Sequence, residues 1–346
     1  MGNPTGIDVP AVTAWLGSRL PWLGGPLEWE RLAGGHSNLT YRVTETGGRQ
    51  FVLRRPPQGD LLPGAHDMGR EFKVMSGLWG TDVPVPEPLA LCTDPSVTGA
   101  PFYAMGAVEG KSLYNVDDVD SLVPVEKRAA LADSFIDTLA ALHSLDPAEV
   151  GLSDLGRPDA YVARQLKRWY MSWTETKTCD RPDVDKLHDF LESVVPSTYT
   201  TRIVHGDYGL HNCVSHCDGY VAAVVDWEIS TLGDPLADLT YCMNAWESEG
   251  SGDLIRPQAP SSAPGFPTRE YLLRRYCERT GTTPDSLAPY SAFNHWKTVC
   301  IIDGVLARYL AGKKSTEGID LVALETGRDR SLDNAVAIAR EVGYTG

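Results

Sequence analysis

The chain has 346 residues and a formal net charge of −15, with 31 Lys and Arg against 46 Asp and Glu. Its apolar fraction of 42% can bury a core, which excludes an intrinsically disordered chain, and its length favours about two domains. A negative field of this size repels phosphate backbones and anionic lipids, so neither nucleic acid nor a membrane is expected as a partner.

Seven cysteines, an odd number, are spread through a chain too large to need disulfides. The first ten residues lack the basic and apolar regions of a signal peptide, and the sequence has no apolar run of about 18 residues. We therefore expect a reduced, cytoplasmic protein. The sequence leaves its oligomeric state open.

The first hundred residues predict a β-rich unit. Apolar residues alternate at 39–43, which indicates strands between residues 29 and 53. Residues 67–79 carry apolar side chains at helical spacing, and a proline-rich segment then ends this helix. Residues 101–108 form another apolar run. The expected order is therefore strands, a helix and a further strand.

Beyond residue 110 the helical pattern dominates. Apolar positions at 127–145 predict an amphipathic helix, and short apolar runs punctuated by glycine predict a β interruption at 201–229. The Gly-, Pro- and Ser-rich residues 247–267 indicate an exposed loop or a mobile lid. We expect Thr268 to cap the helix that follows, and Thr283 with Pro284 to begin the next one.

The segment HGDYGLHN at 205–212 carries the strongest functional signal. Asp207 follows a glycine, Asn212 lies five residues further on, and Asp226 closes the next apolar run. Together they offer one carboxylate to accept a hydroxyl proton and a set of hard oxygen ligands for magnesium. This combination is typical of phosphoryl transfer.

The match to H-G-D-x-x-x-x-N followed by a metal-binding Asp is complete, and the chain resembles the aminoglycoside phosphotransferase-like family of the protein-kinase-like fold. The resemblance implies an α+β fold of two lobes, with an N-terminal nucleotide-binding lobe at 1–106 and a catalytic, substrate-binding lobe at 107–346. It also implies that ATP is the phosphoryl donor, that Asp207 is the catalytic base or the group that orients the hydroxyl, and that Asn212 and Asp226 hold Mg²⁺.

The resemblance places further nucleotide-binding parts upstream. A turn between two strands would cover the phosphates with Gly34, Gly35, Ser37 and Asn38, although the same residues also fit a plain hairpin turn. Arg54 stands where the kinase pattern has a lysine. Glu71, on the following helix, is its expected ion-pair partner, and the alternative is an exposed helical glutamate.

Residues 101–110 resemble the strand and hinge that bind adenine. On this interpretation Met105 flanks the base, while the carbonyl of Gly106 and the N–H of Val108 bond to it. Downstream, Asp234 or Asp238 is expected to brace the catalytic loop. Asp234 also fits the N-cap of a helix that begins with proline, and both roles are compatible.

Two other interpretations of histidines are less favoured. His211, Cys213, His216 and Cys217 crowd together and suggest zinc. Zinc ligands normally come in two separated pairs, however, and here they interleave with Asn212. His143, at the end of an apolar helix, is expected to be a packing residue.

The leading functional hypothesis is an ATP- and Mg²⁺-dependent kinase that phosphorylates a hydroxyl of a small molecule. Within the family the sequence is most similar to kinase-like domains related to those fused to acyl-CoA dehydrogenases, which implies a hydroxyacyl-CoA or a similar metabolite. One alternative is an aminoglycoside-type kinase, whose cationic substrates suit an acidic protein. The other is a nucleotide-binding pseudokinase that acts as a scaffold.

Overall fold

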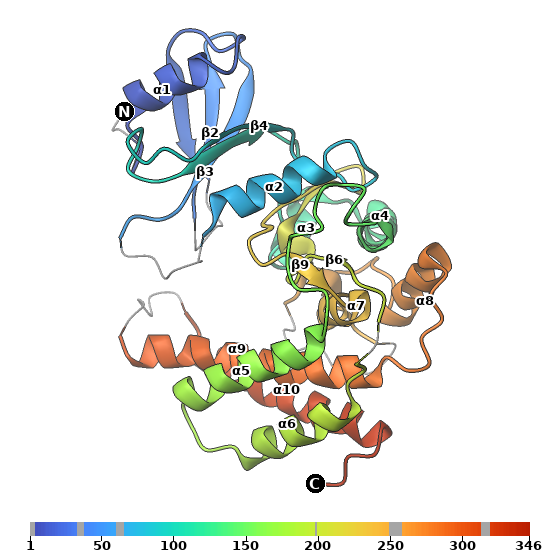
Figure 1. Ribbon diagram of the computed structural model, residues 1–346. Helices are drawn as coiled ribbons and strands as arrows, with labels where there is room; N and C mark the ends of the chain where they lie inside the picture. Colours follow the sequence, from blue (N-terminus) through green and yellow to red (C-terminus); the bar gives the residue numbers. More distant parts are fainter. Residues whose placement is uncertain (1–3, 33–37, 60–65, 198, 249–257, 313–318) are drawn as a thin grey trace.

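The computed structural model describes residues 4–32, 38–59, 66–197, 199–248, 258–312 and 319–346. A small lobe, built on a β-sheet, stands above a larger and mostly helical lobe (Figure 1). The architecture is the α+β, two-lobe arrangement that the sequence predicts.

The small lobe is an antiparallel sheet of five strands in the order β1-β2-β3-β5-β4. The strands are β1 (Leu27–Arg31), β2 (Leu39–Glu45), β3 (Gln50–Arg55), β4 (Pro88–Cys92) and β5 (Phe102–Gly106). The alternation predicted for β2 is confirmed: Leu39, Tyr41 and Val43 are buried on one face. Helix α1 (Val9–Gly17) covers that face through Val12 and Leu16.

The other face of the sheet packs against helix α2 (Met68–Leu78), close to the predicted bounds. Asp67 caps this helix by accepting a hydrogen bond from the backbone N–H of Arg70. Because strand side chains alternate, Arg54 shares the face of Val52 and points toward α2. The pleat of β3 therefore aims Arg54 at Glu71.

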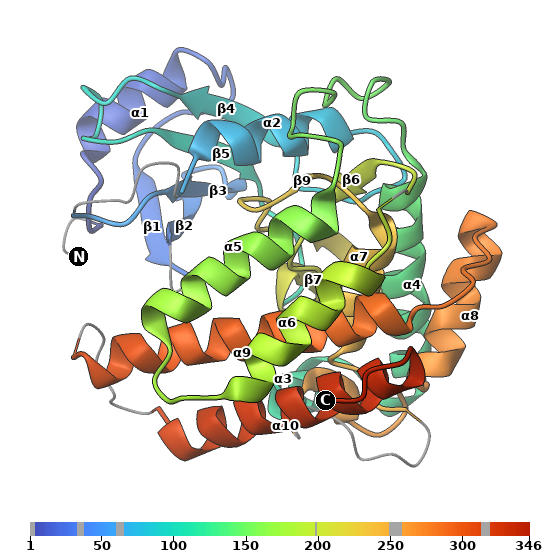
Figure 2. The same ribbon diagram turned by 60° about the horizontal axis from the view of Figure 1, so that its bottom comes forward.

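The large lobe contains two helical layers. Its helices are α3 (Val116–Leu122), α4 (Val125–Ser144), α5 (Tyr161–Thr176), α6 (Pro182–Val194), α7 (Pro235–Met243), α8 (Arg269–Thr280), α9 (Ala288–Leu310) and α10 (Leu321–Glu341). One apolar core joins α4, α7 and α8 to α2 of the small lobe. A second core lies among α5, α6, α9 and α10, where α9 packs against the other three (Figure 2).

The predicted β interruption consists of two short antiparallel ladders. Strand β6 (Arg202–Val204) pairs with β9 (Thr231–Gly233), and β7 (Cys213–His216) pairs with β8 (Tyr220–Val224). The 3-10 turn η1 (Leu210–Asn212) leads into β7. These ladders bring the loop after β6 and the loop after β8 to the same place.

The helix boundaries confirm one capping prediction and correct two. Asp234 caps α7, accepting from the N–H of Leu236 at 3.0 Å. Thr268 occupies the N-cap position of α8, but its side chain makes no capping hydrogen bond. Helix α9 begins at Ala288 and not after Thr283, because the proline that suits a first helical turn is the one at position 289.

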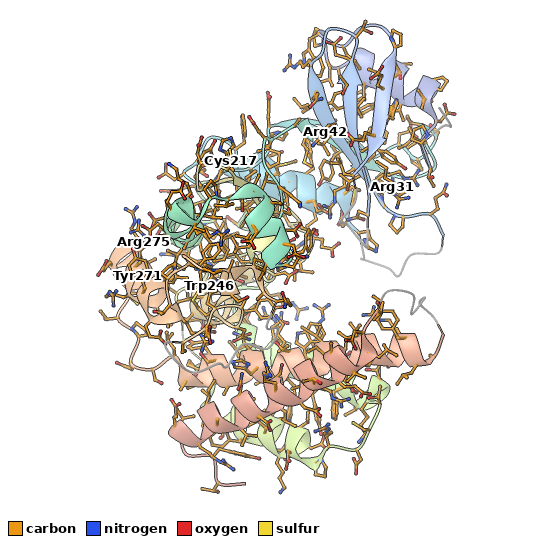
Figure 3. The ribbon with its side chains drawn as sticks, turned by 180° about the vertical axis from the view of Figure 1, so that it is seen from behind. Arg31, Arg42, Cys217, Trp246, Tyr271 and Arg275 are labelled. Carbon is orange, nitrogen blue, oxygen red and sulfur yellow. The ribbon has the colours of Figure 1, made fainter. Side chains whose placement is uncertain are left out.

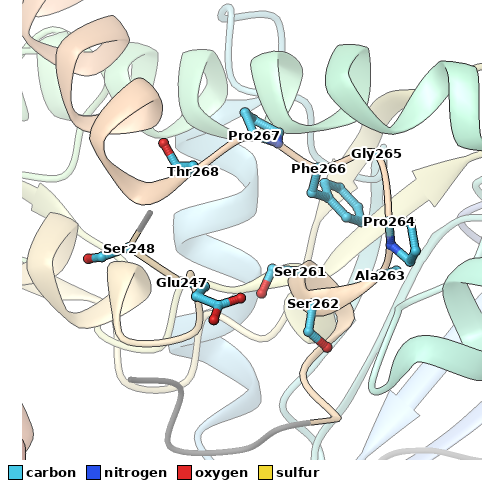
Figure 4. A pocket seen from close by; sticks show the side chains of 10 residues that line it. All are labelled: Glu247, Ser248, Ser261, Ser262, Ala263, Pro264, Gly265, Phe266, Pro267 and Thr268. Carbon is cyan, nitrogen blue, oxygen red and sulfur yellow. The ribbon is translucent and has the colours of Figure 1, made fainter. Parts of the chain in front are cut away.

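The described part of the predicted loop at 247–267 contains one short 3-10 turn, η2 (Pro260–Ser262). Residues of this loop, together with Thr268, line a cavity of about 320 Å³ (Figure 4). All seven cysteines are free thiols. Among the described helices, none has both the length and the apolar character needed to cross a membrane.

Candidate active site

Asp207 lies in the loop that follows β6 in the large lobe. Gly206 has a φ of +85°, a conformation that favours glycine, so the tight turn depends on it. Asp238 accepts hydrogen bonds from the N–H groups of His205 at 2.7 Å and Gly206 at 2.9 Å. Of the two acids expected to brace this loop, Asp238 does so, while Asp234 caps α7.

Asp238 is itself held by His143. The Nε2 atom of His143 lies 3.2 Å from Oδ2 of Asp238, and its Nδ1 lies 2.8 Å from the hydroxyl of Tyr276. Burial alone would raise the pKa of Asp238, but the contacts with His143 and the charge and backbone N–H of His205 lower it below its ordinary value. His143 is therefore a packing residue, as expected, and it also supports the catalytic loop from below.

The carboxylate of Asp207 is held by three neighbours. Asn212 donates its amide N–H to the carbonyl of Asp207 at 2.9 Å and to Oδ2 at 3.2 Å. His211 Nε2 lies 3.4 Å from Oδ2, and the hydroxyl of Tyr241 donates to Oδ1 at 3.3 Å.

The pKa of Asp207 lies below its ordinary value. Burial would raise it, but the contact with His211 and the charges of His205 and Lys297 outweigh burial. The Asp207 side chain is 39% exposed, so an ionised and accessible carboxylate is available to accept a hydrogen bond from an acceptor hydroxyl.

Asp226 has a φ of +68°, a left-handed conformation that is uncommon outside glycine. The preceding residue, Val225, donates its N–H to the carbonyl of Asn212 at 2.9 Å. This backbone bond places the side chains of Asn212 and Asp226 in the same part of the site. Backbone strain of this kind concentrates at functional positions.

Arg54 bridges the two lobes. Its Nη2 lies 2.7 Å from Oδ1 of Asp226, and its Nε lies 3.3 Å from Oε2 of Glu71. Glu71 is 1% exposed and also accepts a hydrogen bond from the hydroxyl of Tyr103 at 2.9 Å. The alternative of an exposed helical glutamate is therefore wrong, and the predicted ion pair between Arg54 and Glu71 is present.

Burial and charge act in opposite directions on this pair. Burial alone would lower the pKa of Arg54, but Tyr103 and the carboxylates of Glu71 and Asp226 raise it above its ordinary value. Burial raises the pKa of Glu71 to about 7 although Arg54 lies beside it. The shorter of the two contacts of Arg54 is the one with Asp226.

The other predicted nucleotide-binding residues are only partly described. Asn38 is buried beside Arg54. With its amide turned so that the oxygen faces the guanidinium, Asn38 accepts from Nη2 at 2.8 Å and from Nε at 3.2 Å. Gly34, Gly35 and Ser37 lie outside the described residues.

The predicted hinge residues follow directly from β5. Met105 is buried within this strand, Gly106 ends it with its N–H bonded to the carbonyl of Glu87 at 2.8 Å, and Val108 is partly buried just beyond. Their contact with adenine remains a prediction.

The residues present fit a magnesium ion. The amide nitrogen of Asn212 is engaged with Asp207, which leaves its oxygen for a cation. Carboxylate oxygens of Glu71, Asp226 and Glu228 all lie within 4.8 Å of one another. Oε2 of Glu228 is buried and has no hydrogen-bond partner among the described residues; Nδ1 of His66 lies 3.6 Å from it. From the sequence, Glu228 counts among the acids that would suit a cationic substrate and is not assigned to the metal site, although an acid two residues after Asp226 was a visible signal.

The zinc alternative finds no support in the geometry. His211 faces Asp207, and Cys213 is buried within β7. The group of possible ligands in this region is His216, Cys217 and Asp218, three consecutive residues at the β7–β8 turn. Both Cys217 and Asp218 are exposed, and Figure 3 shows Cys217 in the large lobe, away from the sheet of the small lobe.

A large, mostly apolar cavity of about 810 Å³ opens beside Asp207. Its apolar wall comes from α9 and α10 and includes Ile301, Ile302, Val305, Ala323 and Leu324. Trp246, which follows α7, also lines the cavity, and Figure 3 shows it in the large lobe. Among the described lining residues the carboxylates are Asp207 and Asp320. The sequence reasoning did not identify this cavity, because its walls come from segments far apart in the chain.

Comparison with known proteins agrees with this geometry. Residues 28–290 match the model of the phosphotransferase enzyme family. Acyl-CoA dehydrogenase family member 10 of Mus musculus is 36% identical over 296 residues, which cover 84% of this chain and 27% of the relative. Family member 11 of Gallus gallus is 35% identical over 303 residues, covering 85% of this chain and 38% of the relative. The chain therefore spans well under half of these two proteins.

Among solved structures, a protein from Ralstonia eutropha with the provisional name aminoglycoside phosphotransferase superposes with a TM-score of 0.81. It is 32% identical, and the alignment covers 96% of this chain and 98% of the other. Similarity over nearly the full length of both chains means that they share both lobes.

Proposed function

The chain belongs to the phosphotransferase enzyme family, and from this premise we propose that it is an ATP- and Mg²⁺-dependent kinase that phosphorylates a hydroxyl of a hydroxyacyl-CoA or a similar small molecule. The proposal depends chiefly on one observation. Asp207 borders the apolar cavity and is hydrogen-bonded by Asn212, whose amide oxygen is left for a metal ion. An acceptor in the cavity and a nucleotide on the metal side would therefore meet at this carboxylate.

The chemistry follows from the position of Asp207. The acceptor hydroxyl donates its hydrogen bond to the carboxylate and transfers its proton there as its oxygen bonds to the γ-phosphorus. The bond between the γ-phosphorus and the bridging oxygen breaks, and ADP leaves. Asn212 and Asp226 would hold Mg²⁺, which would supply positive charge to neutralise the phosphates. Tyr241 and Asn212 fix the carboxylate before the acceptor arrives.

The cavity supports an acceptor with an aliphatic portion. Burial of apolar surface contributes roughly 25 cal/mol per Å², so a wall of isoleucine, valine and leucine favours a hydrocarbon chain. A polycationic sugar would need several carboxylates, whereas the described lining offers Asp207 and Asp320. The names of the curated relatives, which are acyl-CoA dehydrogenase family members, favour the same acceptor class.

The retained chemical groups disfavour a pseudokinase. The pseudokinase alternative rested on Arg54 in place of lysine, and this arginine is positioned between Glu71 and Asp226. A scaffold would need no accessible, ionised carboxylate at Asp207.

Mass spectrometry tests the proposal directly. Purified protein is incubated with ATP, Mg²⁺ and, in separate reactions, positional isomers of hydroxydecanoyl-CoA and the aminoglycoside kanamycin. We expect one phosphate group to be added to a hydroxyacyl-CoA, none to kanamycin, and no product with Asp207→Asn. Phosphorylated kanamycin would instead assign the aminoglycoside alternative. Magnesium-dependent ATP binding without any turnover across both acceptor classes would favour the pseudokinase.

A further inference from the structure

Lys297 is a buried cation of the large lobe with no conventional partner. It lies on α9, is 7% exposed, and its Nζ lies 4.0 Å from the ring centroid of Tyr241 on α7. Among the residues that the structure describes, none forms a hydrogen bond or an ion pair with this ammonium. An ammonium held in a mostly buried position without hydrogen bonds to protein groups is costly, so packing alone does not account for a lysine here.

The ring under Lys297 is the one whose hydroxyl holds Asp207. Tyr241 donates to Oδ1 of Asp207 at 3.3 Å while the ammonium lies over its face. Attraction between a cation and a ring face fixes the ring in place and makes its hydroxyl a better donor. Lys297, Tyr241 and Asp207 therefore form one continuous chain of contacts from α9 to the carboxylate.

The charges around Lys297 come from three elements. Asp207 of the catalytic loop and Asp238 of α7 attract the ammonium, while Arg168 of α5 repels it. The ring of Trp169, also on α5, lies 5.9 Å away. Burial lowers the pKa of Lys297 to about 8, and the two carboxylates offset part of that effect.

We propose that Lys297 is a positioning residue for phosphoryl transfer: through its contact with the ring of Tyr241, whose hydroxyl bonds to Asp207, it keeps the Asp207 carboxylate aimed at the acceptor hydroxyl. The inference rests on the proposed function. It adds a contribution from α9, a helix otherwise assigned only to the wall of the cavity. A lysine in this role acts mainly in the transition state, so it should influence turnover more than binding.

Four variants separate this role from a structural one. Lys297→Met keeps the length of the side chain and removes its charge, and Tyr241→Phe removes only the hydroxyl. Lys297→Arg restores a charge, and Lys167→Met, at an exposed position of α5, is the matched control for a lost lysine. The readouts are kcat and KM with hydroxydecanoyl-CoA, the Kd for MgATP from calorimetry, and the melting temperature.

We expect Lys297→Met to lower kcat about 100-fold, with the KM for acceptor and the Kd for MgATP within about twofold of the parent. Tyr241→Phe should lower kcat in the same way, Lys297→Arg should recover part of it, and Lys167→Met should change nothing. If Lys297 were merely structural, the melting temperature would fall while kcat per folded molecule stayed at the parent value. That result, for Lys297→Met and Tyr241→Phe together, would overturn the proposal.

The pH profile is an independent readout. Since the charged form of Lys297 is needed and its pKa is about 8, kcat/KM of the parent should fall as pH rises through 8. Lys297→Arg should move this fall to higher pH, because a guanidinium stays charged. An identical alkaline fall in Lys297→Met would contradict the role. An inactive parent would refute the proposed function, whereas an active parent with unaffected variants would refute only the role of Lys297.

Discussion

The guanidinium of Arg54 lies 2.7 Å from the carboxylate of Asp226, and this contact joins strand β3 of the small lobe to the loop after β8 in the large lobe. The same guanidinium reaches Glu71 and Asn38. An arginine has five N–H donors in a planar fork, so it serves three neighbours that a compact lysine ammonium would serve less well. The neighbours of Arg54 are therefore placed to bond to a guanidinium at the position where the kinase pattern has a lysine.

The coupling between Arg54 and Glu71 gives the first prediction. Arg54→Ala and Glu71→Ala should each lower kcat/KM for ATP, and the double mutant should be little worse than either, because each variant removes the same interaction. Arg54→Lys should keep part of the activity, since the charge remains although the fork is lost. Steady-state kinetics over the complete cycle measures the coupling.

The exposed pair Arg42 and Glu30 is a matched control for this cycle, because it also joins an arginine to a glutamate, at 3.4 Å, within the small lobe. Its alanine variants should have small and additive effects, as exposed ion pairs usually do. Figure 3 shows Arg42 on the sheet of the small lobe. Additive effects of equal size in both cycles would contradict the role of Arg54.

The second prediction concerns the metal. Asp226→Ala should abolish the magnesium dependence of ATP binding, because it removes an anionic oxygen ligand. Asp226→Asn is the gentler variant, since asparagine tolerates the left-handed backbone at this position. Calorimetric titration of ATP with and without Mg²⁺ measures the effect. Asp218→Ala, at an exposed turn, should leave binding unchanged. Unaltered magnesium-linked affinity in both Asp226 variants would place the metal elsewhere.

Local signals in the sequence predicted much of the fold. The alternation in β2, the spacing in α2 and the capping of α7 by Asp234 depend on neighbouring residues, and the structure confirms all three. The predicted start of α9 was wrong because the sequence offers two prolines that suit a first helical turn, Pro284 and Pro289. The helix begins at the later one. Local patterns do not reveal which of two similar starts the core accepts.

In the candidate site, too, some features were predictable from local sequence and others depend on packing. Asp207, Asn212 and Asp226 lie close together in the chain, so spacing alone indicated their association. The contact of Arg54 with Asp226 and the contact of Lys297 with Tyr241 join segments far apart in the sequence. Such pairs depend on how the lobes and helices pack, and a single sequence carries no pattern that predicts them.

The third prediction is that Asp207→Asn retains the fold and ATP binding but loses turnover. The amide has nearly the volume of the carboxylate and can still bond to Tyr241, yet it cannot accept the hydroxyl proton. The expected loss in kcat is roughly 10²–10⁴-fold, the usual contribution of general-base catalysis. A coupled assay for ADP measures kcat, and the melting temperature reports the fold. Near-normal turnover would remove Asp207 from the mechanism.

The last prediction uses the apolar cavity to measure the length of the acceptor chain. If the cavity binds a hydrocarbon, each added methylene that it buries contributes about 0.8 kcal/mol, so kcat/KM should rise about fourfold per methylene until the chain fills the space. Ile302→Trp would occupy part of the wall of α9 and should end this rise at a shorter chain, leaving hydroxybutyryl-CoA unaffected. Leu310→Trp, on the same helix but 64% exposed and outside the described lining, is the control.

The measurement is kcat/KM across hydroxyacyl-CoA substrates of increasing length for the parent and both variants. If kcat/KM of the parent does not change with chain length, the acceptor places a different group in the cavity. If Ile302→Trp lowers kcat/KM equally for short and long chains, the substitution has damaged the site and has not shortened the cavity.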